Sequence, residues 1–124
     1  MSFESALQTI VGECGGGIGA ALMESDGITI VQVRNEAEPQ SPLGADLSVA
    51  GAEFGRILGE LRKASDSLGG GAVSETVIHL ARFTLIFRSV DDDVILVLAL
   101  QPDGNLGKAR YLIRRHLIEI REQL

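Results

Sequence analysis

The residues best suited to chemistry are few, and their spacing assembles no site. The sequence contains one cysteine, Cys14, and two histidines, His79 and His116. A metal site needs at least three ligands at workable spacing, and no cysteine or histidine lies three or four residues from either histidine. A nucleophilic thiol needs a nearby base, and no basic residue adjoins Cys14. We therefore predict no catalytic residue, no metal ligand and no cofactor.

The glycines Gly15, Gly16, Gly17 and Gly19 form a cluster of the kind found in phosphate-binding loops. A Walker-type loop places Gly-Lys-Ser/Thr ahead of a helix, so that backbone N–H groups and a lysine face the phosphates. Here no lysine follows, and the next segment has the pattern of a strand. The dinucleotide fingerprint also fails, because Leu22 stands where its last glycine is required. The cluster is interpreted as a turn between a helix and a strand.

Three consecutive aspartates, Asp91, Asp92 and Asp93, invite comparison with a calcium loop. The sequence lacks the alternating oxygen ligands and the downstream glutamate of such a loop. Because the aspartates lie between two predicted strands, where this residue type favours turns, we predict a hairpin turn.

Composition narrows the class of protein. The chain has 124 residues, 45% of them hydrophobic, which fits one domain spanning residues 1–124 with a real core. Its net charge of -6 argues against general nucleic-acid binding and against docking on anionic membranes. A single cysteine suits a reducing compartment, and no apolar run reaches the roughly 20 residues that span a bilayer. With no signal-peptide pattern at the N-terminus, we expect a cytoplasmic protein without membrane insertion.

Periodicity predicts the elements that must position any site. Asp26 and Gly27 form a strong hairpin signal between two short β-rich runs. Residues 94–100 are uninterruptedly apolar, as in a central strand covered on both faces. The pattern indicates an α+β class with one mixed or antiparallel sheet between helices. The predicted elements are helix 3–12, strands 18–24 and 28–33, helix 43–68, strands 73–80, 82–90 and 94–101, and a helix from 106 to 124.

The long predicted helix carries a row of small residues: Gly51, Gly55 and Gly59 recur every four positions, and Ser48 and Gly44 extend the row. Each glycine costs up to about 1 kcal/mol of helix stability relative to alanine, so three at one spacing indicate a packing requirement. Such a row lets another backbone approach closely, either the chain's own sheet or a partner helix. Because the row lies partly apart from the apolar stripe of Phe54 and Leu61, the pattern favours one contact of each kind.

The last predicted helix is locally basic, with Lys108, Arg110, Arg114 and Arg115. Tyr111 is the lone aromatic beside these charges, so the stacking platforms of single-strand binders are missing. Cations on such a helix are usually solvated. Some can contact an acidic partner surface or acidic loops of the same domain.

Two segments resemble the Roadblock/dynein light chain family. Residues 98–115, LALQPDGNLGKARYLIRR, are similar to its closing signature, in which a hydrophobic strand and a short turn precede Gly-Asn-x-Gly-basic-Ala-Arg and a basic-apolar helix. Residues 18–28, IGAALMESDGI, look like its first hairpin. Together with the order of elements, the resemblance covers essentially the whole chain.

The resemblance implies a profilin-like Roadblock fold, with a five-stranded antiparallel sheet between helices in the order α-β-β-α-β-β-β-α. Members of the family typically dimerise: their long second helices pack together and their third strands pair edge to edge. Pairing of this kind would protect the alternating strand 73–80 as a sheet edge. For a homodimer of this chain, the implied interface residues are Ser48, Gly51, Gly55, Gly59, Val73, Glu75 and Val77.

Bacterial members of the MglB type act on a small Ras-like GTPase of the MglA type, as activators of hydrolysis or as nucleotide-state-dependent partners. The resemblance thus implies a dimeric, non-catalytic GTPase partner, in which Arg56, Arg62 and Lys63 on the long helix are the candidate partner-binding residues. No arginine finger is assigned. A structural adaptor without effect on nucleotide turnover remains the alternative, and a small-ligand sensor is a third.

Overall fold

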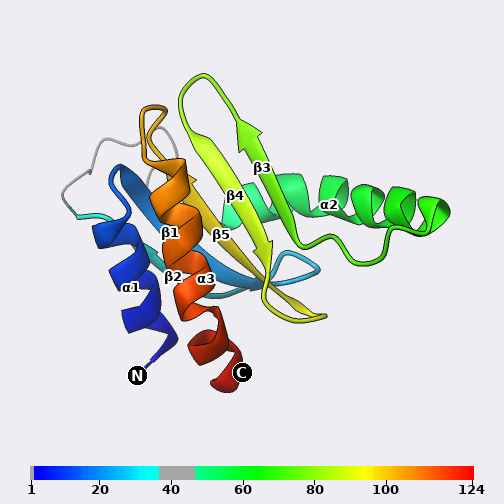
Figure 1. The fold of residues 1–124 in the computed structure, drawn as a ribbon, viewed down its shortest axis with the longest axis horizontal. Coiled ribbons are helices and arrows are strands. Elements are labelled where there is room, and N and C mark those ends of the chain that lie inside the picture. Colours follow the sequence, from blue (N-terminus) through cyan, green and yellow to red (C-terminus); the bar gives the residue numbers. More distant parts are fainter. Residues whose placement is uncertain (1, 37–46) are drawn as a thin grey trace.

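An antiparallel sheet forms the centre of the molecule, and helices cover both of its faces (Figure 1). The computed structural model describes residues 2–36 and 47–124. Within these ranges the strand order is β2-β1-β5-β4-β3, and each neighbouring pair is antiparallel. The predicted class and order of elements are confirmed. The elements are α1 (Phe3–Glu13), β1 (Gly17–Glu24), β2 (Thr29–Arg34), α2 (Ser48–Leu68), β3 (Glu75–His79), β4 (Thr84–Ser89), β5 (Val94–Leu100) and α3 (Leu106–Glu122).

The predicted central strand is β5, which lies between β1 and β4. Its side chains alternate between two cores. Leu96 and Leu98 face α1 and α3, whereas Val97 and Ala99 face α2. Burial on both faces explains why the sequence of this strand is apolar throughout.

The two cores differ in size. The one under α1 and α3 is the larger, and it includes Leu7, Ile10 and Ile113. The one under α2 gathers around Met23 and Phe87 at the N-terminal half of that helix. One sheet face is therefore well covered, and the other only in part.

Several predicted boundaries shift. The predicted helix 43–68 is seen from Ser48, and residues 43–46 lie outside the described ranges. The prediction that strand 73–80 includes Val73 is wrong, because β3 begins at Glu75. Ladder contact starts at Ser74, whose carbonyl accepts from the Ser89 N–H at 2.9 Å, and Gly71 before it has a φ of 83°. At the other end, Leu80 donates to the Phe83 carbonyl, so the hairpin turn shortens the strand predicted at 82–90.

The glycine cluster is the predicted turn, and it packs against the turn before α3. Gly15 and Gly16 have positive φ angles of 76° and 89°. The Gly15 carbonyl accepts from the Asn105 N–H at 2.9 Å, and the Gly16 carbonyl accepts from the Gln101 N–H at 2.7 Å. A Cβ on Gly16 would lie 2.8 Å from the Cα of Gly104. The start of β1 is thus tied to the start of α3 through backbone atoms alone.

This contact makes a matched pair of substitutions informative. We expect Gly16→Ala to lower the free energy of unfolding by about 2 kcal/mol or more, through the left-handed backbone and the overlap with Gly104. Gly12→Ala is the control. It lies in α1 with nothing within 4 Å of the added Cβ, so it should raise stability by roughly 0.5–1 kcal/mol. Urea denaturation measures both, and equal effects would contradict the packing described.

Candidate interaction surface

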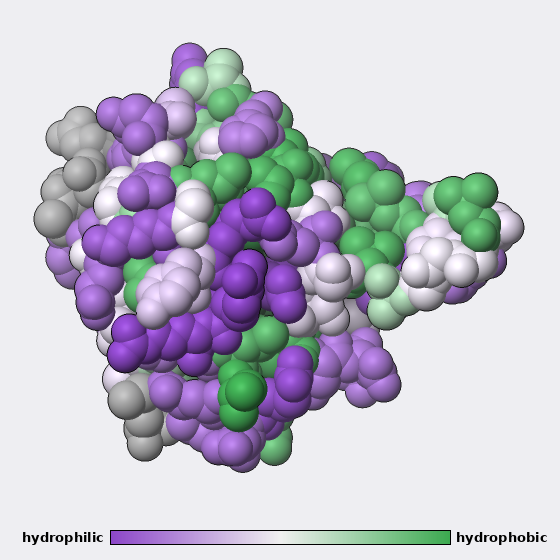
Figure 2. Space-filling view, in the orientation of Figure 1, coloured by the Kyte–Doolittle hydropathy of each residue, from purple (hydrophilic) through white to green (hydrophobic). Residues whose placement is uncertain are grey.

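The least covered element is α2. Of its 21 residues, only Ala50 and Gly51 are buried, and its C-terminal half projects beyond the β3 edge of the sheet (Figure 1). Ile57 is 45% exposed and Leu68 is 85% exposed, and Figure 2 shows hydrophobic side chains along this projecting part. Exposed apolar residues grouped on one element are typical of a protein-binding surface.

The glycine row turns gradually from the sheet toward solvent. A Cβ on Gly51 would overlap the sulfur of Met23 in β1, whereas Gly55 and Gly59 have nothing within 4 Å. A step of four residues rotates by about 40° around a helix of 3.6 residues per turn, which explains the progression. Gly51 is therefore needed for packing inside the protomer. Gly55 and Gly59 remain open to a partner.

The helix has two distinct flanks beside its sheet-facing side. Phe54 and Leu58 face the sheet, and the rings of Phe54 and Phe87 lie 5.7 Å apart. By the same rotation, the open glycines Gly55 and Gly59 lie on one flank. Three of the four large exposed apolar residues of α2 lie toward the other flank: Ile57, Leu61 and Leu68. The fourth, Val49, lies on the outward face.

Of the other residues implied for the dimer interface, Val77 packs against the α1–α3 core and Glu75 forms ion pairs within the chain. Both lie on β3, which has one hydrogen-bonded neighbour, β4, in the described sheet. Its outer edge is thus available for pairing. Val73 precedes the strand and is half-buried, and Ser48 is half-buried at the start of α2.

The three candidate partner-binding cations, Arg56, Arg62 and Lys63, are exposed on α2. Lys63 forms an ion pair with Glu60 at 3.2 Å, and both side chains are well solvated, so the pair contributes little to stability. Arg62 lines a groove between α2 and the sheet. The three cations thus lie on one helix, but their side chains do not converge on a single site.

This groove is a feature that sequence reasoning missed. It has a volume of about 390 Å³ and brings together parts of the chain that are distant in sequence. At its rim, Asp91 accepts hydrogen bonds from the N–H groups of Asp93 and Val94, which confirms the predicted hairpin turn. Its lining residues are Leu58, Arg62, Val73, Thr76, Phe87, Ser89, Asp91, Asp92 and Ile95.

Cys14 and His79, which were considered as candidates for chemistry, contact other residues in ways that stabilise the fold. Cys14 ends α1, where its Sγ lies 3.7 Å from the Val11 carbonyl, and burial raises the pKa of its thiol. A raised pKa keeps the thiol protonated and unreactive. The Nδ1 of His79 lies 3.1 Å from the Thr84 hydroxyl. Within residues 2–36 and 47–124, no group of three or more His, Cys, Asp or Glu residues is arranged to hold a metal.

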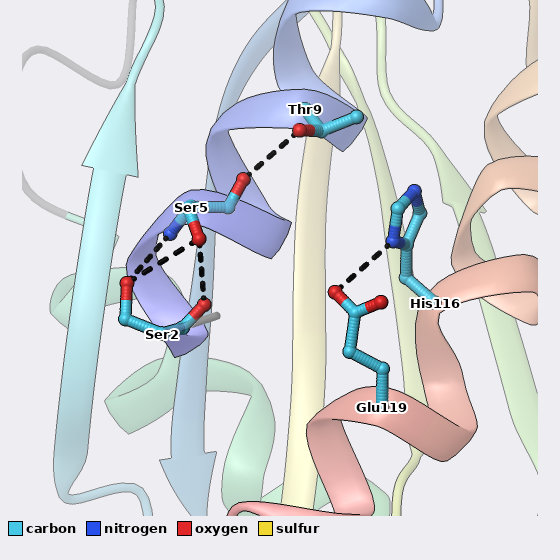
Figure 3. A network of polar contacts seen from close by, with 5 residues as sticks. All are labelled: Ser2, Ser5, Thr9, His116 and Glu119. Atoms are coloured by element: carbon cyan, nitrogen blue, oxygen red, sulfur yellow. Dashed lines mark hydrogen bonds and ion pairs between the residues drawn. The ribbon is translucent and has the colours of Figure 1, made fainter.

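Figure 3 shows the polar contacts where α1 meets α3. The Ser2 hydroxyl accepts from the Ser5 N–H at 3.2 Å and caps α1, and Thr9 donates to the Ser5 carbonyl. On α3, the Nδ1 of His116 lies 3.5 Å from Glu119. Each of these contacts lies within a single helix or its cap. None of the helices in the described part of the chain is both long and apolar enough to cross a membrane.

No protein-family model and no curated protein matches the chain. Several solved structures match the chain. MglC from Myxococcus xanthus is 33% identical, with 100% of both chains covered and a TM-score of 0.70. A Roadblock/LC7 domain from Streptomyces avermitilis is 14% identical, with 99% of this chain and 98% of that one covered and a TM-score of 0.82. The gliding protein MglB from Thermus thermophilus is 19% identical, with 98% and 89% covered and a TM-score of 0.82.

The two more distant structures, at these identities, demonstrate a shared fold, the profilin-like Roadblock arrangement predicted from the sequence. The match to MglC goes further, since a third of the residues are identical over the full length of both chains. This chain belongs to the Roadblock/LC7 family, among the MglB and MglC homologues.

Proposed function

We propose that this protein is a homodimer that binds a small Ras-like GTPase and regulates its nucleotide state or its rate of GTP hydrolysis. The observation that carries the proposal is the exposure of α2, a long helix with apolar and basic residues that its own sheet leaves uncovered. The resemblance of residues 18–28 and 98–115 to Roadblock proteins, whose MglB-type members act on Ras-like GTPases, supplies the class of partner.

Two elements at the same edge of the sheet support the proposed dimer, because each leaves groups without a partner in the protomer. There β3 offers an unpaired strand edge, and α2 projects past that edge with its apolar side chains exposed. A second copy related by a twofold axis can satisfy both at once, because an isologous interface uses the same patch on each subunit. Complete burial of a side chain such as Leu68 contributes roughly 1.5–3 kcal/mol, and each such contact occurs twice in a twofold dimer.

The GTPase is proposed to bind the outward face of the paired helices, near Arg56 and Lys63. A rigid helical face can order the mobile switch segments of a GTPase and so position the attacking water. The mechanism needs no catalytic group from this chain. The role is therefore that of a regulator acting through shape and charge.

Dimerisation is tested by one substitution on each flank of α2. Gly55→Leu should convert the protein to a monomer if the glycine flank meets the partner helix, since a leucine prevents close approach. Leu61→Glu should do the same if the apolar flank is buried, because an unpaired charge is costly to bury. Sedimentation velocity at micromolar concentration measures the outcome. Glu60→Leu, on the outward face, is the control and should stay dimeric. If both flank variants remain fully dimeric, α2 does not form the interface.

GTPase regulation is tested with a Ras-like GTPase from the same genome. Turnover is measured with and without a molar excess of this protein, alongside binding to the GDP-bound and GTP-analogue-bound states. We expect faster turnover and preferential binding of one state. Binding without any change in rate would instead establish a structural adaptor.

Charge reversal locates the GTPase-binding face. The double variant Arg56→Glu, Lys63→Glu should weaken GTPase binding at least about tenfold while the dimer stays intact, since two favourable contacts become repulsive. Arg115→Glu on α3 is the control and should bind like the unmodified protein. Unchanged binding by the double variant, or no binding to any of several candidate GTPases, would refute the proposal.

A further inference from the structure

A small basic pocket lies on the sheet face opposite α2, where β3 and β4 meet α3. It is shallow, with an enclosed volume of about 10 Å³, and Figure 2 shows strongly hydrophilic side chains gathered in this region. Two isoleucines contribute apolar lining, and the remaining residues are charged. The lining residues are Glu75, Ile86, Arg88, Arg110, Ile113 and Arg114.

The carboxylate of Glu75 forms ion pairs with the guanidinium groups of both Arg110 and Arg88 in this pocket. The Nε of Arg110 lies 2.7 Å from one oxygen of Glu75, and an Nη of Arg110 donates to the other at 3.2 Å. Only the Nη contact has hydrogen-bond geometry, and the oxygen nearest the Nε has no hydrogen-bond partner among the described residues. Arg88 reaches the second oxygen at only 3.7 Å, and its buried Nε has no hydrogen-bond partner among the described residues. The Glu75 carboxylate thus does not satisfy all the N–H donors of the two arginines.

The pocket also has an excess of positive charge. Three arginines and one glutamate leave a net charge of +2 in a chain whose total is -6. Arg110 and Arg114 are one turn apart on α3, a spacing at which like charges repel. Both effects favour an anion from outside.

We propose that this pocket binds an acidic segment of a partner protein, with one Asp or Glu carboxylate of that segment pairing with Arg114 and Arg88. The enclosed space is about 10 Å³, far below the roughly 300–1,000 Å³ of small-molecule sites, so the carboxylate would pair with the arginines at the mouth of the pocket and not enter it. Tyr111 and Ile118 are exposed beside it on α3 and supply apolar contacts for the rest of the segment. The inference does not depend on the GTPase.

The position of Glu75 gives the proposal an unusual test. Its carboxylate occupies donors that an incoming carboxylate would also use, so it competes with the partner. Glu75→Gln should therefore tighten binding of an acidic peptide, by about threefold or more. A residue with a purely structural role gives no such gain.

The probe is a fluorescein-labelled peptide of eight glutamates, titrated at low salt and followed by anisotropy, with an eight-glutamine peptide as the neutral comparison. Arg114→Glu should weaken binding about tenfold or more. Arg115→Glu changes the net charge equally but lies about 100° further around the helix, so its effect should stay within about threefold. Amide chemical shifts on titration should change in β3, β4 and the first half of α3.

Three results would overturn the proposal: equal weakening by the two arginine variants, which indicates bulk charge only; shift changes centred on α2; or weaker binding by Glu75→Gln. Tighter binding of an eight-nucleotide single strand at the same residues would reassign the pocket to nucleic acid. Circular dichroism establishes that each variant is folded. Arg114 and Arg115 are both exposed, so this pair decides the matter if Glu75→Gln does not fold.

Discussion

A five-stranded sheet has two faces to remove from water, and the described part of this chain supplies three helices for that purpose. Five strands at about 4.8 Å spacing span about 20 Å, whereas one helix with its side chains is about 10 Å wide. The pair α1 and α3 suffices for one face, as the larger core there indicates. The other face has α2 alone. Its incomplete coverage explains the groove, the exposed apolar residues and the small core beneath that helix.

The two faces consequently differ in character. The α2 face is apolar with scattered charges of both signs, and the border of α3 with β3 is basic. The sheet separates them, so occupation of one does not obstruct the other. A protein with two such faces is suited to bring separate partners together, and this suits the regulator and the adaptor equally.

The fold was largely predictable from the sequence because its determinants are local. The hairpin at Asp26 and Gly27, the apolar run of β5 and the turn of three aspartates each depend on a few adjacent residues. The start of β3 was missed, since nothing in the local sequence distinguishes Val73 from the strand that follows. The resemblance of residues 98–115 supplied the profilin-like arrangement, which periodicity alone left open.

The sites were less predictable because they depend on contacts between distant residues. A period of four is not the period of a helix, so the glycine row leaves the sheet face after Gly51, and the sequence alone could not show where. Glu75 and Arg110 are 35 residues apart, and only the folded sheet brings them into contact. The groove under α2 draws on four elements and the turns between them, and it has no sequence signature.

The pairing of β1 with β5 has a consequence for synthesis. Gly17 pairs with Leu100, and the Gly15 carbonyl accepts a hydrogen bond from the Asn105 N–H. The middle of the sheet can therefore form only after residues 94–105 have emerged from the ribosome. Until then β1, with seven of its eight residues destined for the interior, has only β2 as a neighbour. Exposed apolar strands of this kind are prone to aggregation. We therefore expect the nascent chain to depend on chaperones until β5 and Asn105 have been synthesised, and then to close the sheet in one late step.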